Sequence, residues 1–145
     1  MSPRTYEPED EWHGELHAFA QVSDFTGRSA AWFSREALIS FSRALEQYPL
    51  PPHAPVTIFG GLGAITGDRP EHVQVGLTIA PAGVTGTLLV CVELASDPPA
   101  TRPSDVQQSA LLRFLTEYAA LDQFRIALSA MLNNGDEAIL RGTGT

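Results

Sequence analysis

The sequence predicts an α+β fold in which an antiparallel β-sheet of about six strands is covered by two amphipathic helices. A helical pattern occurs twice, because Ala37-Leu38-x-x-Phe41-x-x-Ala44-Leu45 recurs as Ala120-Leu121-x-x-Phe124-x-x-Ala127-Leu128. The Leu and Phe residues of each copy fall on one helix face. Between and before these helices, strand-like alternation is interrupted by turn residues, which is typical of hairpins. The expected order is strand, strand, helix, four strands, helix, strand.

The first 33 residues predict a polar arm followed by a β-hairpin. Residues 1–11 carry prolines and acids and are expected to form a flexible acidic arm, whereas residues 12–145 are expected to form one domain. Residues 12–22 alternate with the period of a strand. The run Ser23-Asp24-Phe25-Thr26-Gly27 is typical of a turn. Residues 28–33 then return as the second strand.

The first helix has a clear start and a clear end. Ser34 is the expected N-cap, because its hydroxyl can accept from the free amides of the first turn. Its buried stripe is expected to comprise Leu38, Phe41, Leu45 and Tyr48. Prolines at 49, 51 and 52 prevent continuation, since each lacks an amide proton.

The central part of the chain predicts three strands and a glycine-rich loop. Residues 56–59 form a short strand candidate, and residues 60–70 a loop. The GxGxxxG spacing in that loop differs from a phosphate-binding motif and leads to no helix, which favours a flexible connection. Residues 73–79 alternate clearly, and Pro81-Ala82-Gly83 predicts a hairpin turn.

The strand expected at residues 85–95 is apolar on both faces. Leu88, Val90, Val92 and Leu94 share one face, while Leu89 and Cys91 lie on the other. Such a strand is either central and covered or part of an interface. Residues 96–106 carry three prolines and predict an exposed loop.

Residues 107–133 leave two interpretations open. They form either one long helix or a strand at 108–116 followed by a helix that begins near Tyr118. We favour the second, because the helical repeat begins only at Ala120. Asn133-Asn134-Gly135 predicts the end of this helix, and residues 138–140 predict a last edge strand.

Composition narrows the classes of function. The formal net charge is −8, all nine basic residues are arginine, and residues 1–24 hold six acids against Arg4 alone. This balance argues against nucleic-acid binding and suits a basic protein partner, although plain solubility is the explanation that we favour for it. The absence of lysine excludes Schiff-base and P-loop lysine chemistry.

The sequence also predicts the compartment. No apolar run approaches the roughly 20 residues that span a bilayer, and the N-terminus has no apolar signal core. We therefore expect no membrane association. The single cysteine, Cys91, cannot form an intrachain disulfide, which suits the cytoplasm.

One constellation invites a metal site. His13, Glu15 and His17 share a face if they lie on a strand, and two histidines with a carboxylate can hold zinc or iron. A solvated sheet face is the alternative that we favour, so no metal, cofactor or catalytic residue is expected. Cys91 is interpreted as a small buried hydrophobe rather than a nucleophile.

Aromatic residues suggest a second kind of site. Trp12, Phe25 and Trp32 either pack in the core or anchor a protein partner, since aromatics dominate binding hot spots. Together with the acids of the N-terminal segment they define the residues expected to contact a partner: Glu9, Asp10, Glu11, Trp12, Glu15, Asp24 and Phe25.

Four short motifs resemble those of the WapI-like toxin-immunity proteins, which are small bacterial domains. They are Ser23-Asp24-Phe25-Thr26-Gly27, Trp32-Phe33-Ser34, His72-Val73-Gln74-Val75 and Arg113-Phe114-x-x-Glu117-Tyr118-x-x-Leu121-x-x-Phe124. The resemblance covers residues 12–132. It implies a non-enzymatic protein that is encoded beside a secreted toxin, which it binds and neutralises.

Two other functions are compatible with the sequence. The chain can be a homodimer or assembly subunit that uses the face of Leu89 and Cys91. It can also be a metal-dependent enzyme that uses the face of His13, Glu15 and His17.

Overall fold

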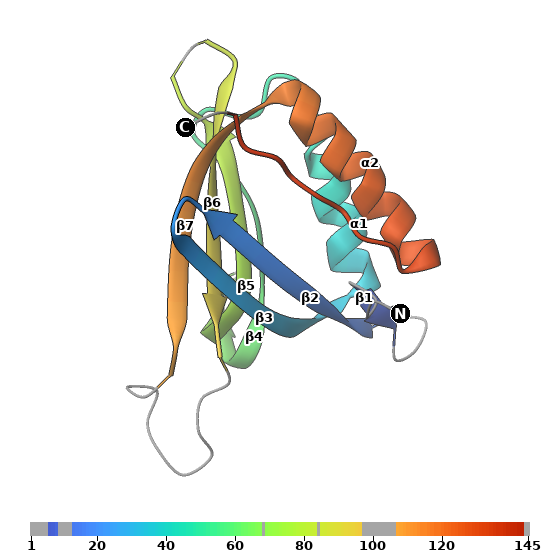
Figure 1. Ribbon diagram of the computed structural model, residues 1–145. Helices are drawn as coiled ribbons and strands as arrows, with labels where there is room; N and C mark the ends of the chain where they lie inside the picture. The colour runs from blue at the N-terminus through green and yellow to red at the C-terminus, as the bar shows by residue number, and fades with distance from the viewer. Residues whose placement is uncertain (1–5, 9–12, 68, 84, 97–106, 144–145) are drawn as a thin grey trace.

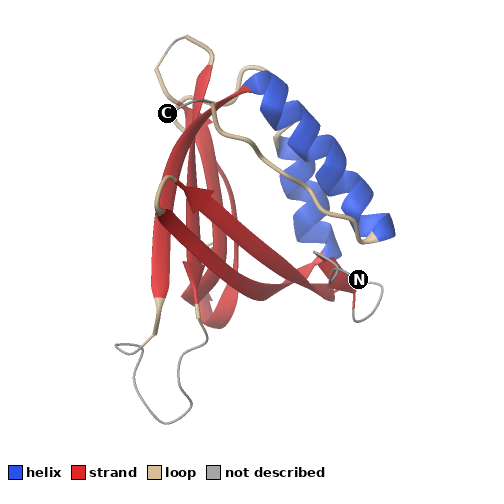
Figure 2. Cartoon of the chain, in the orientation of Figure 1, coloured by secondary structure: helices blue, strands red, loops and turns tan. Residues whose placement is uncertain are grey.

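The computed structural model describes residues 6–8, 13–67, 69–83, 85–96 and 107–143. Within them, strands and helices follow the order strand, strand, strand, helix, four strands, helix (Figures 1 and 2). Their bounds are β1 (Tyr6–Pro8), β2 (His13–Val22), β3 (Phe25–Ser34), α1 (Arg35–Ala44), β4 (Val56–Thr66), β5 (Arg69–Pro81), β6 (Thr87–Ala95), β7 (Ser109–Glu117) and α2 (Tyr118–Asn134).

The strands form two antiparallel sheets, β1-β2-β3 and β4-β5-β6-β7. The α+β class is confirmed, but the expectation of a single sheet of about six strands is wrong. The β2–β3 hairpin lies across the four-stranded sheet instead of extending its edge (Figure 1). Gly27 permits this close approach, because a Cβ there would lie 3.1 Å from Leu94 Cδ1 and 3.2 Å from Ala110 Cβ.

The two ends of the chain differ from the expected order. Residues 6–8 of the expected flexible arm form β1, which pairs with residues 14–16 of β2. The edge strand expected at residues 138–140 is not formed. Ala138 and Leu140 nevertheless pack against the core, so apolar contact holds this segment rather than a hydrogen-bonded ladder.

The glycine-rich run is part of a strand, and the predicted flexible loop is wrong. β4 continues to Thr66 and pairs with β5, with register shifts between Gly60 and Gly61 and between Leu62 and Ile65. A Cβ on Gly61 would clash with the carbonyl oxygen of His72. The glycine therefore allows two backbones to approach closely at a bulge.

Both helices begin and end for local reasons. The amide of Ala37 donates to Ser34 Oγ at 3.0 Å, which confirms the N-cap of α1. Gly135 ends α2 in the left-handed region, at φ 73°, and its amide donates to the carbonyl of Met131. The favoured interpretation of residues 107–133 is also confirmed, because β7 ends at Glu117 and α2 begins at Tyr118.

Tyr48 does not belong to the buried stripe of α1. The helix ends at Ala44, and Tyr48 is 78% exposed. Its ring instead meets the ring of Tyr118 edge to face, with centroids 4.7 Å apart. The hydroxyl of Tyr118 accepts from the amide of Leu50 at 3.0 Å. The segment that joins α1 to β4 is therefore held by contacts with a residue of α2.

One hydrophobic core joins all layers. The four residues of β6 that were expected to share a face all contribute to this core: Leu88, Val90, Val92 and Leu94. Both helices and β3 pack against them. The helices and the hairpin thus lie on the same side of the four-stranded sheet (Figure 2). The side chain of Leu89 lies on the other face of the sheet, where it is 38% exposed. Neither helix of the described chain has the length and apolar character that crossing a membrane requires.

Candidate binding surface

The outer face of the β2–β3 hairpin gathers side chains of several kinds. In the antiparallel register, Glu15 lies opposite Trp32, His17 opposite Ala30, and Phe19 opposite Arg28. Residues directly opposite each other share one face of a sheet. The alternate residues of β2, among them Leu16 and Ala18, pack against the core. We call the outward set the hairpin face; its members are Glu15, His17, Phe19, Arg28, Ala30 and Trp32.

Two large aromatic side chains of this face are exposed to solvent. Phe19 is 58% exposed and Trp32 is 49% exposed. The guanidinium carbon of Arg28 lies 5.2 Å from the centre of the Phe19 ring, within cation–π range. More than half of the Phe19 side chain stays exposed beside this contact. Trp32 therefore does not pack in the core, which was one of the two placements expected for it.

The polar part of the hairpin face is a histidine–carboxylate pair. His17 Nε2 lies 3.1 Å from Glu15 Oε1, and both side chains are partly exposed. His13 lies on the same side of β2, next to the hairpin face, and its side chain is exposed. It is not part of the pair formed by His17 and Glu15. In the part of the chain that the structure describes, no three His, Cys, Asp or Glu side chains are placed to hold a metal ion.

A recess adjoins the hairpin face. It has a volume of about 360 Å³ and is bordered by Glu15, Arg28 and Trp32 of the hairpin. Gln74 of β5, which is buried, contributes to the lining from the other sheet. The hairpin face therefore offers a partner both protruding aromatic groups and a polar hollow beside them, as protein interfaces commonly do.

The expected partner-binding residues are distributed unevenly. Glu15 lies within the hairpin face. Asp24 lies in the hairpin turn, and Phe25, the first residue of β3, follows it and is 69% exposed. The remaining four, Glu9, Asp10, Glu11 and Trp12, lie outside the described residues.

Phe19 and Arg28 belong to the site but were not singled out from the sequence. Phe19 continues the alternation of His13, Glu15 and His17 along one strand, so its place on this face was visible in the period of two. Arg28 lies on the next strand, and only the register of the hairpin shows that it meets Phe19.

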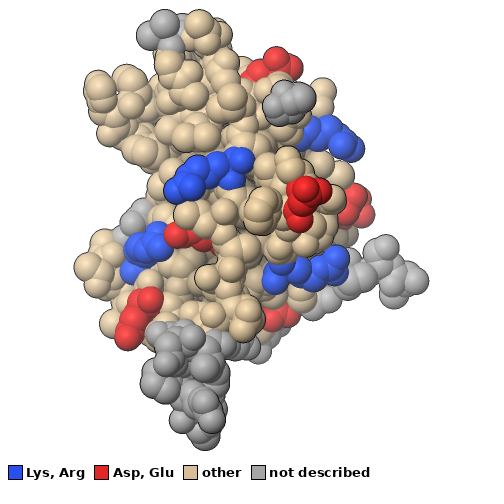
Figure 3. All heavy atoms as spheres, turned by 60° about the vertical axis from the view of Figure 1, so that its left-hand side comes forward, with Lys and Arg blue, Asp and Glu red and all other residues tan. Residues whose placement is uncertain are grey.

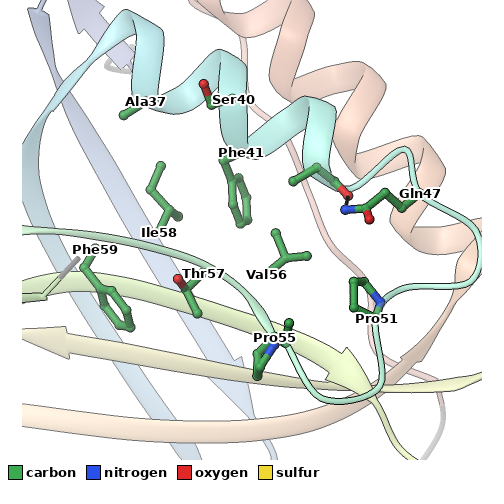
Figure 4. Close-up of a pocket in the computed structure, with 12 residues that line it drawn as sticks. Ala37, Ser40, Phe41, Gln47, Pro51, Pro55, Val56, Thr57, Ile58 and Phe59 are labelled. Carbon is green, nitrogen blue, oxygen red and sulfur yellow. Dashed lines mark hydrogen bonds between the residues drawn. The ribbon is translucent and has the colours of Figure 1, made fainter. Parts of the chain in front are cut away.

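A second concave region lies between α1 and β4 (Figure 4). This groove has a volume of about 510 Å³ and is lined by Phe41 and Ser40 of α1, by Val56, Ile58 and other residues of β4, and by the connection between them. The described residues that line it include no ionisable side chain. Its chemistry suits contact with an uncharged group.

The comparisons with protein-family models, with curated proteins and with solved structures gave no match for this chain.

Proposed function

We propose that this chain is a non-enzymatic binding protein of the toxin-immunity type, which holds a basic protein partner against the hairpin face in the cytoplasm. The observation that carries the proposal is the exposure of Phe19 and Trp32 on one ordered surface. Exposed aromatic side chains are typical anchors of protein interfaces, because their burial removes a large apolar area from water at little entropic cost.

Charge supports a basic partner. The chain carries a net charge of −8, Glu15 lies on the hairpin face, and Asp24 lies in the turn of the hairpin. A negative field speeds the encounter with a cationic surface and sets the orientation of the complex. The resemblance to immunity proteins supplies the class of partner, a secreted toxin domain.

The test is co-expression of the tagged chain with the products of adjacent genes, followed by size-exclusion chromatography and calorimetry of any complex. The Trp32→Ala variant should bind about 30-fold more weakly, as expected for the loss of an anchor worth about 2 kcal/mol. Ile126→Ala is the matched control, since Ile126 is also exposed, at 60%, but lies on α2.

Two results would contradict the proposal. One is the absence of a complex with any adjacent gene product. The other is a complex in which Trp32→Ala and Ile126→Ala have the same affinity as the unmodified chain, because binding would then use another surface.

A further inference from the structure

The outer face of the four-stranded sheet, on the side away from the helices, exposes a small apolar patch. In the register of β6 with β7, Leu89 lies opposite Leu115, and Cys91 lies opposite Arg113. Leu89, Leu111 and Leu115 are 38%, 48% and 46% exposed. No element of the described part of the chain covers them, because the helices and the hairpin pack on the other face (Figure 1).

Two charged residues flank Leu115 along β7. Arg113 and Glu117 lie on either side of Leu115, on the same face of the strand. They are about 13 Å apart along an extended strand, which is too far for an ion pair. Among the described residues, neither side chain takes part in a hydrogen bond or an ion pair. Both charges are therefore free to meet an opposite charge from outside.

We propose that this face binds a second copy of the chain through a two-fold axis that passes across the strands at Leu89 and Leu115. In such an isologous contact both copies use the same surface patch, so every contact between two different residues occurs twice. The axis places β7 antiparallel over β7 of the second copy. Leu115 then packs on its own equivalent, as does Leu89, and Arg113 of each copy faces Glu117 of the other.

The balance of charge favours a second copy over a basic partner at this face. Glu93 is already neutralised, because Arg69 donates to both of its carboxylate oxygens, at 2.9 and 3.0 Å. Among the described residues of β6 and β7, the charged side chains on this face are Glu93, Arg113 and Glu117, so with Arg69 paired to Glu93 their charges balance, although the whole chain is strongly acidic. Figure 3 shows this side of the molecule, with charges of both signs among uncharged atoms. A neutral, self-complementary face suits its own copy.

The experiment is sedimentation velocity of the full chain over about 1 to about 100 micromolar, the range in which weak dimers form. The unmodified chain should dimerise. Arg113→Glu and Glu117→Arg should each raise the dissociation constant at least about tenfold, because each creates two like-charge contacts. Arg43→Glu is the matched control, since Arg43 is exposed on α1 and has the same change of charge.

Mixing the two variants tests the register itself. A heterodimer of Arg113→Glu with Glu117→Arg regains opposite charges at both contacts, so equimolar mixing should restore dimers that neither variant forms alone. Far-UV circular dichroism checks that both variants are folded. A monomeric unmodified chain, or a mixture that remains monomeric when each variant is folded, overturns the proposal.

Discussion

Single side chains show how sharply the helical period divides the apolar residues of one helix into buried and exposed ones. Leu121 of α2 is completely buried, whereas Ile126 of the same helix is 60% exposed. The repeated Leu and Phe pattern predicts the first, because residues at steps of three and four share a face. It also leaves Ile126 outside that face, so this difference follows from the sequence.

Leu121→Ala should destabilise the protein by about 2 to 5 kcal/mol, the usual cost of removing a buried leucine and leaving a cavity. Ile126→Ala should change stability by less than about 0.5 kcal/mol, because its side chain is largely in water. Urea unfolding followed by circular dichroism measures both. Equal losses of stability in the two variants would contradict the packing of α2 described above.

Secondary-structure elements show which boundaries are local. Ser34 caps α1 through a hydrogen bond to a residue of its own first turn, so the sequence predicts it. The position of Tyr48 depends on Tyr118, which is distant in the chain, so the sequence does not. The bulges of β4 likewise depend on its pairing with β5.

Ser34→Ala should lower the free energy of unfolding by about 1 kcal/mol, because the first turn of α1 loses its cap. Ser40→Ala removes a hydroxyl from the exposed side of the same helix and serves as the control. The difference between their urea midpoints reports the cap alone, and identical midpoints would show that the hydroxyl of Ser34 contributes nothing.

At the scale of the molecule, two sheets and two helices share one core. The hairpin contributes Ala31 and Phe33 to this core, and both are nearly inaccessible to solvent. The hairpin face is thereby held on a rigid support. A binding surface on such a support needs little ordering when a partner arrives.

The shared core predicts a single cooperative unfolding transition. In a Trp12→Phe background, fluorescence of Trp32 reports the hairpin, while far-UV circular dichroism reports the whole chain. The two signals should give the same urea midpoint, as two-state behaviour requires. Loss of the hairpin signal at a lower urea concentration would mean that the hairpin unfolds independently.

The sequence by itself determined the features that depend on neighbours along the chain. These include the two amphipathic helices, the β2–β3 hairpin, the N-cap at Ser34, and the shared face of Glu15 and His17. Period and local hydrogen bonding fix them within a few residues.

Only the tertiary structure decided how these elements combine. It placed the hairpin across the four-stranded sheet, brought Arg28 over Phe19, and left Trp32 and the face of Leu115 in water. Alternation says that a strand has two faces but does not say which element covers each one. That choice depends on register and on close approaches such as the one at Gly27, which join residues far apart in the chain.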